Sequence, residues 1–377
     1  MIERLLKIGI NEDLFKCKTL ILYGARQVGK TTLVQEILKE YGKSGRYLNC
    51  EILSVEQSLK EAEPEKLKAF LGNYNLIVLD EAQNIPDIGR VLKIITDTLK
   101  DVQLIATGSS SFDLAYKTSE PMTGRIIHHT LYPLSILEIK SKEDWLSVDA
   151  KLERLLRFGL YPEVYTSTDE DAVHKLNELA SSYLFKDLLK FEGIKKSSLL
   201  KNLVLSLALQ VGNEVTYNEL AVKLGVSSMT VQKYIDLLEQ CFVIFKLNSF
   251  SRNIRKELTK SFKIYFYDNG IRNALINNFN PLSLRNDVGA LWENFCIAER
   301  IKANAYSKRK ANIYFWRTYD QKEIDYVEET AGTITGYELK YTPNQKFKIP
   351  KGFSETYDAQ VYKIDKSNYW KFVELNI

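Results

Sequence analysis

The 377-residue chain is long enough for two to three domains, and its 45% hydrophobic content is sufficient to bury a sizeable core. Its 52 lysines and arginines against 48 aspartates and glutamates leave a net charge of +4, which neither requires nor excludes a polyanionic partner. No apolar run approaches the ~18 residues of a membrane span, and the four cysteines are far apart without a CxxC pair, so we expect a cytoplasmic protein with reduced thiols and no membrane partner.

Residues 1–132 alternate short apolar runs with helical patterns. The runs predict four strands, at 19–23, 46–50, 76–79 and 103–107. Because these runs are apolar almost throughout, they indicate a parallel sheet that is covered on both faces. We therefore predict that this region is an α/β domain built from alternating strands and helices.

The hydrophobic period changes twice after this region. Residues 133–202 have a helical period, which predicts a helical lid, and residues 203–257 predict a small helical unit with a strand at 242–247. Residues 258–377 again combine strands with one long helix. We therefore predict a separate α/β domain at the C-terminus.

The first predicted strand is followed at once by the phosphate-loop pattern GxxxxGKT and then by a predicted helix. The pattern and its next residue are Gly24, Ala25, Arg26, Gln27, Val28, Gly29, Lys30, Thr31 and Thr32. Such a loop wraps phosphate oxygens in backbone N–H groups at a helix N-terminus. The sequence therefore predicts ATP bound with Mg²⁺, with Lys30 on the β and γ phosphates and Thr31 as a metal ligand.

Asp80 and Glu81 follow the apolar strand at 76–79, at the edge of the sheet where ligands of parallel sheets collect. This arrangement is typical of a Walker B motif. We expect Asp80 to hold Mg²⁺ through water and Glu81 to orient and polarise the attacking water. The alternative is a solvated turn, which an Asp-Glu pair after a strand often forms.

Two further residues are candidates for the reaction with the γ-phosphate. Ser109 follows the strand at 103–107 and is the candidate sensor of that phosphate, although it is equally compatible with the N-cap of a helix starting near Ser111. Arg125 precedes another apolar run and is the candidate arginine finger. The alternative for Arg125 is an ordinary surface arginine.

Together with the phosphate loop, several short motifs make the chain resemble a prokaryotic AAA+ ATPase family. These motifs are Asp80-Glu81-Ala82-Gln83, Thr107-Gly108-Ser109-Ser110, Gly124-Arg125, Pro133-Leu134-Ser135 and Gly159-Leu160-Tyr161-Pro162-Glu163. Members of that family carry a C-terminal domain of unassigned function that is similar to PD-(D/E)XK nucleases. The resemblance implies an AAA-like core, a helical and winged-helix middle and a restriction-endonuclease-like end. Leu160 departs from the family's usual double glycine.

Residues 217–235 predict a helix, a turn at Gly225 and a second helix capped by Ser227. In DNA-binding relatives the second helix enters the major groove. Here it would expose four side chains, those of Ser228, Thr230, Lys233 and Tyr234. The alternative is that this unit is a packing module, because the same fold often serves that purpose within ATPases.

The C-terminal elements follow the nuclease order of helix, three strands, connection and strand, with strands expected at 312–317, 323–327, 336–341 and 360–364. Asp325, Glu338 and Lys340 fall where the nuclease motif requires them, and residues two apart on a strand share a face. Asp325 and Glu338 would hold Mg²⁺, Lys340 would support the attacking water, and Glu293 would either bind the ion directly or support its ligands from behind them. The alternative is amphipathic strand sequence whose charges face water.

The sequence therefore favours an ATP-hydrolysing AAA+ ATPase that controls a winged-helix and nuclease-like part acting on DNA. The first alternative is a nucleotide-controlled regulatory or signalling switch whose C-terminal domain binds without cutting. The second is a protein-remodelling ATPase, which no aromatic pore-loop signature supports. The sequence leaves the state of oligomerisation open.

Overall fold

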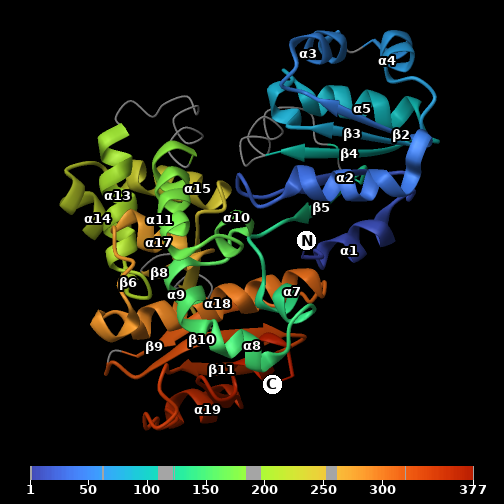
Figure 1. The fold of residues 1–377 in the computed structure, drawn as a ribbon. Coiled ribbons are helices and arrows are strands. Elements are labelled where there is room, and N and C mark those ends of the chain that lie inside the picture. Colours follow the sequence, from blue (N-terminus) through green and yellow to red (C-terminus); the bar gives the residue numbers. More distant parts are fainter. Residues whose placement is uncertain are drawn as a thin grey trace. The chain divides into compact units, whose positions relative to one another are not determined.

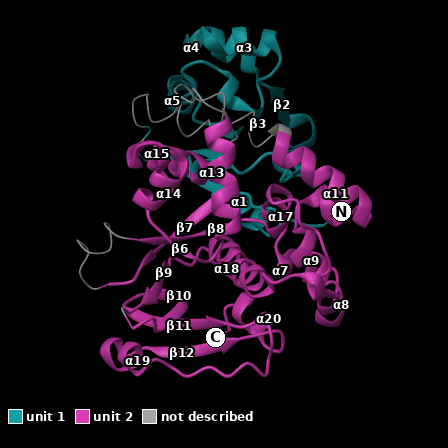
Figure 2. Ribbon diagram, turned by 90° about the vertical axis from the view of Figure 1, so that its left-hand side faces the viewer, with its two compact units in different colours: residues 1–133, 240–242 teal, residues 134–239, 243–377 magenta. Residues whose placement is uncertain are grey.

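The computed structural model describes residues 2–61, 63–108, 122, 124–183, 197–251, 261–318 and 320–376. Within these ranges, no helix is both long and apolar enough to cross a membrane. The chain forms two compact units, which are residues 1–133 with 240–242 and residues 134–239 with 243–377 (Figure 2). The boundary expected after residue 132 lies within one residue of the observed one, whereas the divisions expected at 203 and 258 fall inside the second unit.

The first unit contains a five-stranded parallel sheet in the order β2-β3-β4-β1-β5 (Figure 1). Its strands are β1 (Thr19–Tyr23), β2 (Gly45–Asn49), β3 (Leu76–Asp80), β4 (Gln103–Gly108) and β5 (Ile126–Thr130). The parallel sheet confirms the predicted α/β class, and the four expected strands agree with β1 to β4 within one residue at each end. β1, β3 and β4 are buried on both faces, as their continuous apolar runs indicate.

Helices cover both faces of this sheet (Figure 1). They are α1 (Leu6–Asp13), α2 (Lys30–Tyr41), α3 (Leu53–Lys60), α4 (Pro64–Leu71) and α5 (Ile88–Thr98). On one face, α3, α4 and α5 bury Leu59, Leu71 and Val91 in a cluster with alternate strand residues such as Ile77. On the other face, α2 lies against β2, β3 and β4. The helices therefore cover the central strands β1, β3 and β4, whose carboxyl ends lie side by side in the sheet.

The second unit contains a seven-stranded mixed sheet in the order β12-β11-β10-β9-β7-β8-β6. Its strands are β6 (Glu214–Val215), β7 (Ile244–Ser249), β8 (Phe262–Phe266), β9 (Asn312–Arg317), β10 (Glu323–Thr330), β11 (Thr333–Leu339) and β12 (Gln360–Ile364). β7 pairs in parallel with β9 at Asn248 and Ser249. The predicted winged-helix segment and the predicted C-terminal domain thus share one sheet, which is why the division expected at 258 does not separate compact units.

Helices lie on both faces of this sheet, with α18 drawn on one face and α19 on the other (Figure 1). They are α7 (Ile136–Lys140), α8 (Trp145–Ala150), α9 (Leu152–Phe158), α10 (Pro162–Tyr165), α11 (Asp169–Glu178), α13 (Ser197–Leu209), α14 (Tyr217–Leu224), α15 (Ser228–Gln240), α17 (Asn269–Leu275), α18 (Val288–Tyr306), α19 (Lys351–Tyr357) and α20 (Tyr369–Val373). Phe353 of α19 packs with Trp316 and Ile324 in a buried cluster, so α19 is joined to the sheet by apolar contacts.

Buried polar contacts attach the predicted helical lid to the C-terminal elements. The amide of Ile136 donates to Oε2 of Glu299 at 2.6 Å, and Nζ of Lys302 donates to the carbonyl of Leu134 at 3.0 Å. The amide of Leu160 donates to Oδ2 of the buried Asp268 at 2.6 Å. Since buried charged groups require such partners, these contacts join lid and C-terminal elements into one unit.

Candidate functional site

The phosphate-loop residues lie between β1 and α2, as the sequence predicts. Gly24 has a φ of 152°, and a Cβ at this position would lie 2.2 Å from the carbonyl oxygen of Leu131. Gly29 has a φ of 95° and caps α2. Glycine adopts both conformations without strain, whereas other residues do not. The two glycines therefore allow the loop to present its backbone N–H groups to a ligand at the N-terminus of α2. Of the other loop residues, Ala25 and Val28 are buried, whereas Gln27 and Thr32 are exposed and Arg26 is half-buried.

Lys30, the first residue of α2, is buried with 5% of its surface exposed. Its Nζ donates to the carbonyl oxygens of Gly24 and Ala25, each at 2.9 Å. The ammonium group is therefore held against the backbone of its own loop. A phosphate oxygen is a stronger acceptor for an ammonium than a neutral carbonyl, so this position suits a bound phosphate.

Asp80 ends β3 and joins three hydroxyl groups from neighbouring elements. Its Oδ2 accepts from the hydroxyl of Thr31 at 2.8 Å and from that of Tyr47 on β2 at 2.5 Å, while its Oδ1 accepts from the hydroxyl of Thr107 on β4. Burial and the contact with Asp80 raise the pKa of Tyr47 well above its ordinary value, so the phenol remains a donor. Thr31 and Asp80 thus present adjacent oxygen atoms, the ligand type that Mg²⁺ prefers.

Glu81 lies beside this group in a left-handed conformation, with a φ of 55°. Its amide donates to the hydroxyl of Thr107 at 3.0 Å, and its Oε2 accepts from Nε2 of Gln83. Thr107 therefore contacts both acidic residues from the strand between β1 and β3. The sequence analysis proposed Ser109 as the sensor, and Ser109 lies outside the described residues.

Three contact residues of this site were missed by the sequence analysis. Tyr47 lies in a strand that was expected only for its apolarity, and Thr107 was quoted only as part of a motif. Thr107 stands near the carboxyl end of β4, a position that could have identified it once the strand order was known. Tyr47 is the middle residue of β2 and reaches Asp80 through its hydroxyl. The third is Arg4, whose guanidinium donates to the carbonyl of Val28 at 2.6 Å, and nothing in the sequence pattern indicates this contact.

Arg125 is not brought to the phosphate loop of its own chain. It precedes β5, and its carbonyl accepts from the amide of Thr19 at the start of β1, whereas Gly24 follows the end of β1. Five residues of strand, about 17 Å, separate the two edges of the sheet. The Arg125 side chain is exposed and its Nε pairs with Oδ1 of Asp97 at 2.6 Å. This contradicts a role for Arg125 as a finger within its own site.

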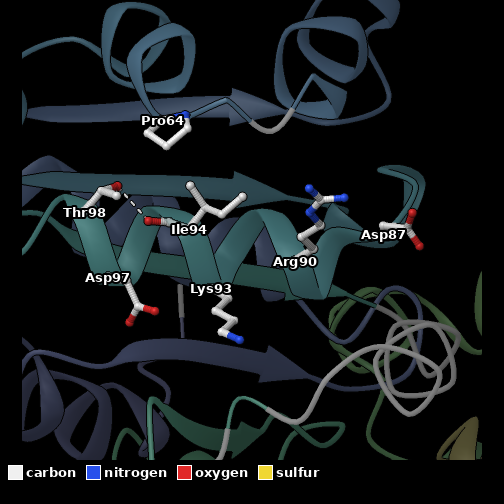
Figure 3. A pocket seen from close by; sticks show the side chains of 7 residues that line it. All are labelled: Pro64, Asp87, Arg90, Lys93, Ile94, Asp97 and Thr98. Atoms are coloured by element: carbon white, nitrogen blue, oxygen red, sulfur yellow. Dashed lines mark hydrogen bonds between the residues drawn. The ribbon is translucent and has the colours of Figure 1, made fainter.

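Asp97 also lines a cavity of about 590 Å³ between α4 and α5 (Figure 3). Figure 3 shows Thr98, Ile94 and Arg90 on the side of α5 that faces Pro64 of α4, whereas Lys93 and Asp97 point away from Pro64. The lining residues are Pro64, Asp87, Arg90, Lys93, Ile94, Asp97 and Thr98. None of the residues that the sequence analysis selected for a site is among them. This cavity is therefore separate from the phosphate loop.

In the second unit, Asp325 and Glu338 are brought together around one lysine. Nζ of Lys340 lies 2.5 Å from Oε1 of Glu338 and 3.7 Å from Oδ2 of Asp325, and the latter oxygen also accepts from the amide of Leu339. Lys340 follows β11 directly instead of lying within it, because the strand covers Thr333–Leu339. Both carboxylates are buried, which contradicts the alternative that these charges face water.

Glu293 on α18 has different partners. Its Oε1 accepts from the hydroxyl of Tyr265 at 2.5 Å and lies 3.2 Å from Nζ of Lys263, both on β8. Lys263 is almost fully buried and also pairs with Glu323. Sequence reasoning missed Lys263 and Tyr265 because no strand was expected at 262–266, although both residues lie within the predicted C-terminal domain.

Burial changes the acidity of these carboxyl groups. Burial, together with the negative charge of Asp325, raises the pKa of Glu338 to about 7. Burial likewise raises the pKa of Glu293 to about 7, although Lys263 opposes this shift. Carboxyl groups with such pKa values are typical of functional clusters, but structural ion-pair networks also produce them.

The fit of a metal ion to this cluster can be judged from the donors. Within the described ranges, no three His, Cys, Asp or Glu side chains are arranged to hold a metal ion. Mg²⁺ is nevertheless often bound by one or two carboxylates with water completing its shell. The buried Oε2 of Glu338 accepts no hydrogen bond from the described residues, and Asp325 shares Lys340 with it. These two carboxylates fit one divalent ion, whereas Glu293 is committed to Tyr265 and Lys263.

The helix pair α14 and α15 has the predicted turn, with Gly225 at a φ of 66°. Lys233 is exposed, Ser228 and Thr230 are half-buried, and the hydroxyl of Thr230 lies 2.9 Å from that of Ser227. Tyr234 is buried with 5% exposure, so the expectation that it would be exposed is wrong. The reason is its helical position beside Val231 and Leu238, which form the buried stripe of α15.

Three family models match successive parts of the chain. Residues 16–140 match an AAA domain, residues 149–282 match a domain of unknown function (DUF8612), and residues 288–370 match a domain of unknown function (DUF4143). The AAA match includes the phosphate loop and the Asp80-Glu81 pair. It supports an AAA-type, nucleotide-binding ATPase.

Similar proteins occur in distant microorganisms. An uncharacterised protein of Mycobacterium tuberculosis is 29% identical over 337 residues, which are 88% of this chain and 72% of that protein. An uncharacterised protein of Haemophilus influenzae is 23% identical over 356 residues, which are 89% of this chain and 84% of that protein. Both similarities extend over almost the whole chain, including both units.

Solved structures give weaker similarities. Pif1 from Bacteroides sp in complex with ADP-AlF4 is 16% identical, with a TM-score of 0.25, over 48% of this chain and 52% of that chain. Drosophila ORC bound to AT-rich DNA and Cdc6 is 10% identical, with a TM-score of 0.27, over 72% of this chain and 89% of that chain. TM-scores this low carry no argument about the chain's fold or ligands.

Proposed function

We propose that the chain binds ATP with Mg²⁺ at the phosphate loop, hydrolyses it, and uses the nucleotide state to control its second unit on DNA. The observation that carries the first part is the hydrogen-bonded group in which Thr31, Thr107 and Tyr47 all contact Asp80 beside the loop. Lys30 would neutralise phosphate charge, Thr31 and Asp80 would hold Mg²⁺, and Glu81 would orient the attacking water. Phosphate release from ATP, with and without Mg²⁺, tests this assignment.

DNA is the proposed partner of the α14–α15 pair. The support is the helix-turn-helix arrangement, followed by strands β7 and β8, with Lys233 and Lys223 exposed on it. Exposed lysines on such helices contact phosphates, and these contacts make binding salt-dependent. The partial burial of Ser228 and Thr230 leaves Lys233 as the first residue to test.

We expect Lys233→Ala to weaken DNA binding and to lower the slope of log affinity against log salt by roughly 0.9, the value for one lost phosphate contact. The measurement is a DNA titration of the full chain at several salt concentrations. Lys351→Ala, an exposed lysine at the start of α19, is the matched control and should keep the wild-type slope. An unchanged slope in Lys233→Ala would favour the packing-module alternative.

The cluster around Lys340 is proposed to bind one divalent ion through Asp325 and Glu338. When bound, such an ion would polarise a phosphate oxygen of a nucleic acid. Lys340, which already contacts both carboxylates, would then hold the same phosphate group by its charge. Glu293 would orient Lys263 and Tyr265 instead of binding the ion.

We expect the full chain, carrying Lys30→Ala and free of nucleotide, to bind Mn²⁺ at millimolar concentration, and we expect Asp325→Asn to abolish this binding. The full chain is needed because a fragment starting near residue 258 would lack β7, the partner of β9. Glu329→Gln, on the same strand as Asp325, is the control for a lost charge. Mn²⁺ paramagnetic broadening of NMR signals, or calorimetry, provides the measurement.

A chain that binds no Mn²⁺ in this test would favour the second candidate, a nucleotide-controlled regulatory switch without cleavage. A specific observation favours it: the buried ammonium of Lys263 pairs with Glu293 and Glu323, so that lysines already balance part of the negative charge. In that case the second unit would bind its partner without cutting it, and the ATPase assignment would be unaffected.

A further inference from the structure

Arg4, which precedes α1, is a buried cation beside the phosphate loop, and the proposed function gives it no role. Only 8% of its surface is exposed. Its Nη1 donates to the carbonyl of Val28 and its Nη2 to the carbonyl of Tyr132, both at 2.6 Å. A guanidinium holds two acceptors in a fixed geometry, so Arg4 fixes the distance between these two backbone positions.

Both of these positions have functional neighbours within the first unit. Val28 directly precedes Gly29 and Lys30 in the phosphate loop. The segment that follows β5 approaches the loop a second time, because the carbonyl oxygen of Leu131 lies 2.2 Å from the position that a Cβ on Gly24 would take. The amide of Leu131 also donates to the carbonyl of Tyr23 at 2.8 Å. The loop therefore cannot shift without moving the segment around Leu131 and Tyr132.

This segment leads directly to the connections between the two units. The chain leaves the first unit after Pro133, returns at Gln240, and leaves again after Phe242. The ring of Tyr132 contacts the ring of Phe242 edge to face, with centroids 6.4 Å apart, and Phe242 packs against the core of the first unit. All three covalent connections thus lie within three residues of this pair of rings.

We propose that Arg4 is a positioning residue that couples the phosphate loop to these connections, and through them to the C-terminal end of α15. The coupling deepens the proposed function and rests on ATP binding at the loop. A bound phosphate draws Lys30 from the carbonyls of Gly24 and Ala25, and the loop adjusts its backbone. Arg4 carries the displacement of Val28 to Tyr132, and the Tyr132 ring carries it to Phe242, two residues after α15 ends.

The test is hydrogen exchange of the full chain with and without ATP and Mg²⁺. In the wild-type chain we expect ATP to change the protection of amides at residues 124–135 and 236–246 by about fivefold or more, the lower range of known couplings. In Arg4→Met, which keeps an apolar stem but no donors, ATP should still bind through Lys30 and Thr31, and the change at 236–246 should be lost. Lys7→Met is the control and should behave as wild type, because Lys7 lies on α1 and its Nζ pairs with the exposed Glu40.

Phe242→Leu provides an independent test, because it leaves Arg4 and the loop untouched. We expect it to keep ATP turnover and the change at 124–135 but to lose the change at 236–246. This variant decides the matter if Arg4→Met does not fold. If the Arg4→Met chain is less stable yet keeps the full ATP-linked change, the role of Arg4 is only structural, and the proposal is overturned.

The two levels of the account can be separated in the same experiment. A wild-type chain that binds ATP without any change at 236–246 overturns the coupling and leaves the ATPase assignment standing. A wild-type chain that binds no ATP overturns both.

Discussion

Lys30→Ala is expected to abolish tight ATP binding. Lys30 is the only lysine of the phosphate loop, and its ammonium lies across the loop carbonyls where phosphate oxygens would bind. Removing one partner of a desolvated charge pair costs about 2–5 kcal/mol, which weakens binding roughly 30- to 5,000-fold. Calorimetric titration with ATP and Mg²⁺ measures this effect.

The control for this variant is Lys39→Ala, an exposed lysine in the last turn of the same helix. It removes the same charge and stem about 13 Å farther along α2, so ATP affinity should stay at the wild-type value. Circular dichroism should show both variants folded. Unchanged ATP affinity in a folded Lys30→Ala chain would refute the assignment of the loop.

Glu81→Gln is expected to separate binding from turnover. The substitution keeps the shape of the side chain and its contact with Gln83, and it leaves Lys30, Thr31 and Asp80 intact. ATP affinity should therefore remain within a few-fold of wild type. Because general bases contribute about 10²- to 10⁴-fold, we expect turnover to fall at least about 100-fold, or about 2.7 kcal/mol in the barrier.

Steady-state phosphate release and ATP titration of the same preparation measure the two effects of Glu81→Gln. Glu65→Gln on α4 is the matched control, because Glu65 is exposed and lies before β3, whereas Glu81 directly follows β3. Wild-type turnover in Glu81→Gln would assign the water-orienting role to another residue. A parallel loss of binding would show that Glu81 supports the loop instead.

The sequence predicts the first unit well because its signals are local. Continuous apolar runs identify the strands β1 to β4, and the glycine pattern identifies the phosphate loop, since Gly24 and Gly29 adopt positive φ values there. Tyr47 and Thr107 could not be selected in the same way. They contact Asp80 because β2 and β4 flank β3. The local sequence pattern does not predict this strand order.

The second unit is less predictable because long-range pairing determines it. β7, which the hydrophobic period assigns to the middle part, pairs with both β8 and β9 of the predicted C-terminal domain. Lys263 and Tyr265 of β8 lie beside Glu293, and no local pattern predicts that neighbourhood. The burial of Asp325 and Glu338 agrees with their predicted neighbourhood, but Arg125 shows the limit of motif reasoning. A residue can follow a glycine at the right point of a motif and still stand at the opposite edge of the sheet.

ATP hydrolysis by the purified wild-type chain tests the central claim most directly. The measurement is phosphate release over many turnovers with Mg²⁺, with EDTA in place of Mg²⁺, and in the Lys30→Ala chain prepared in parallel. The account predicts multiple turnovers that require Mg²⁺ and disappear in Lys30→Ala. A folded wild-type chain that neither binds ATP nor releases phosphate, or one whose phosphate release persists unchanged in Lys30→Ala, would contradict it.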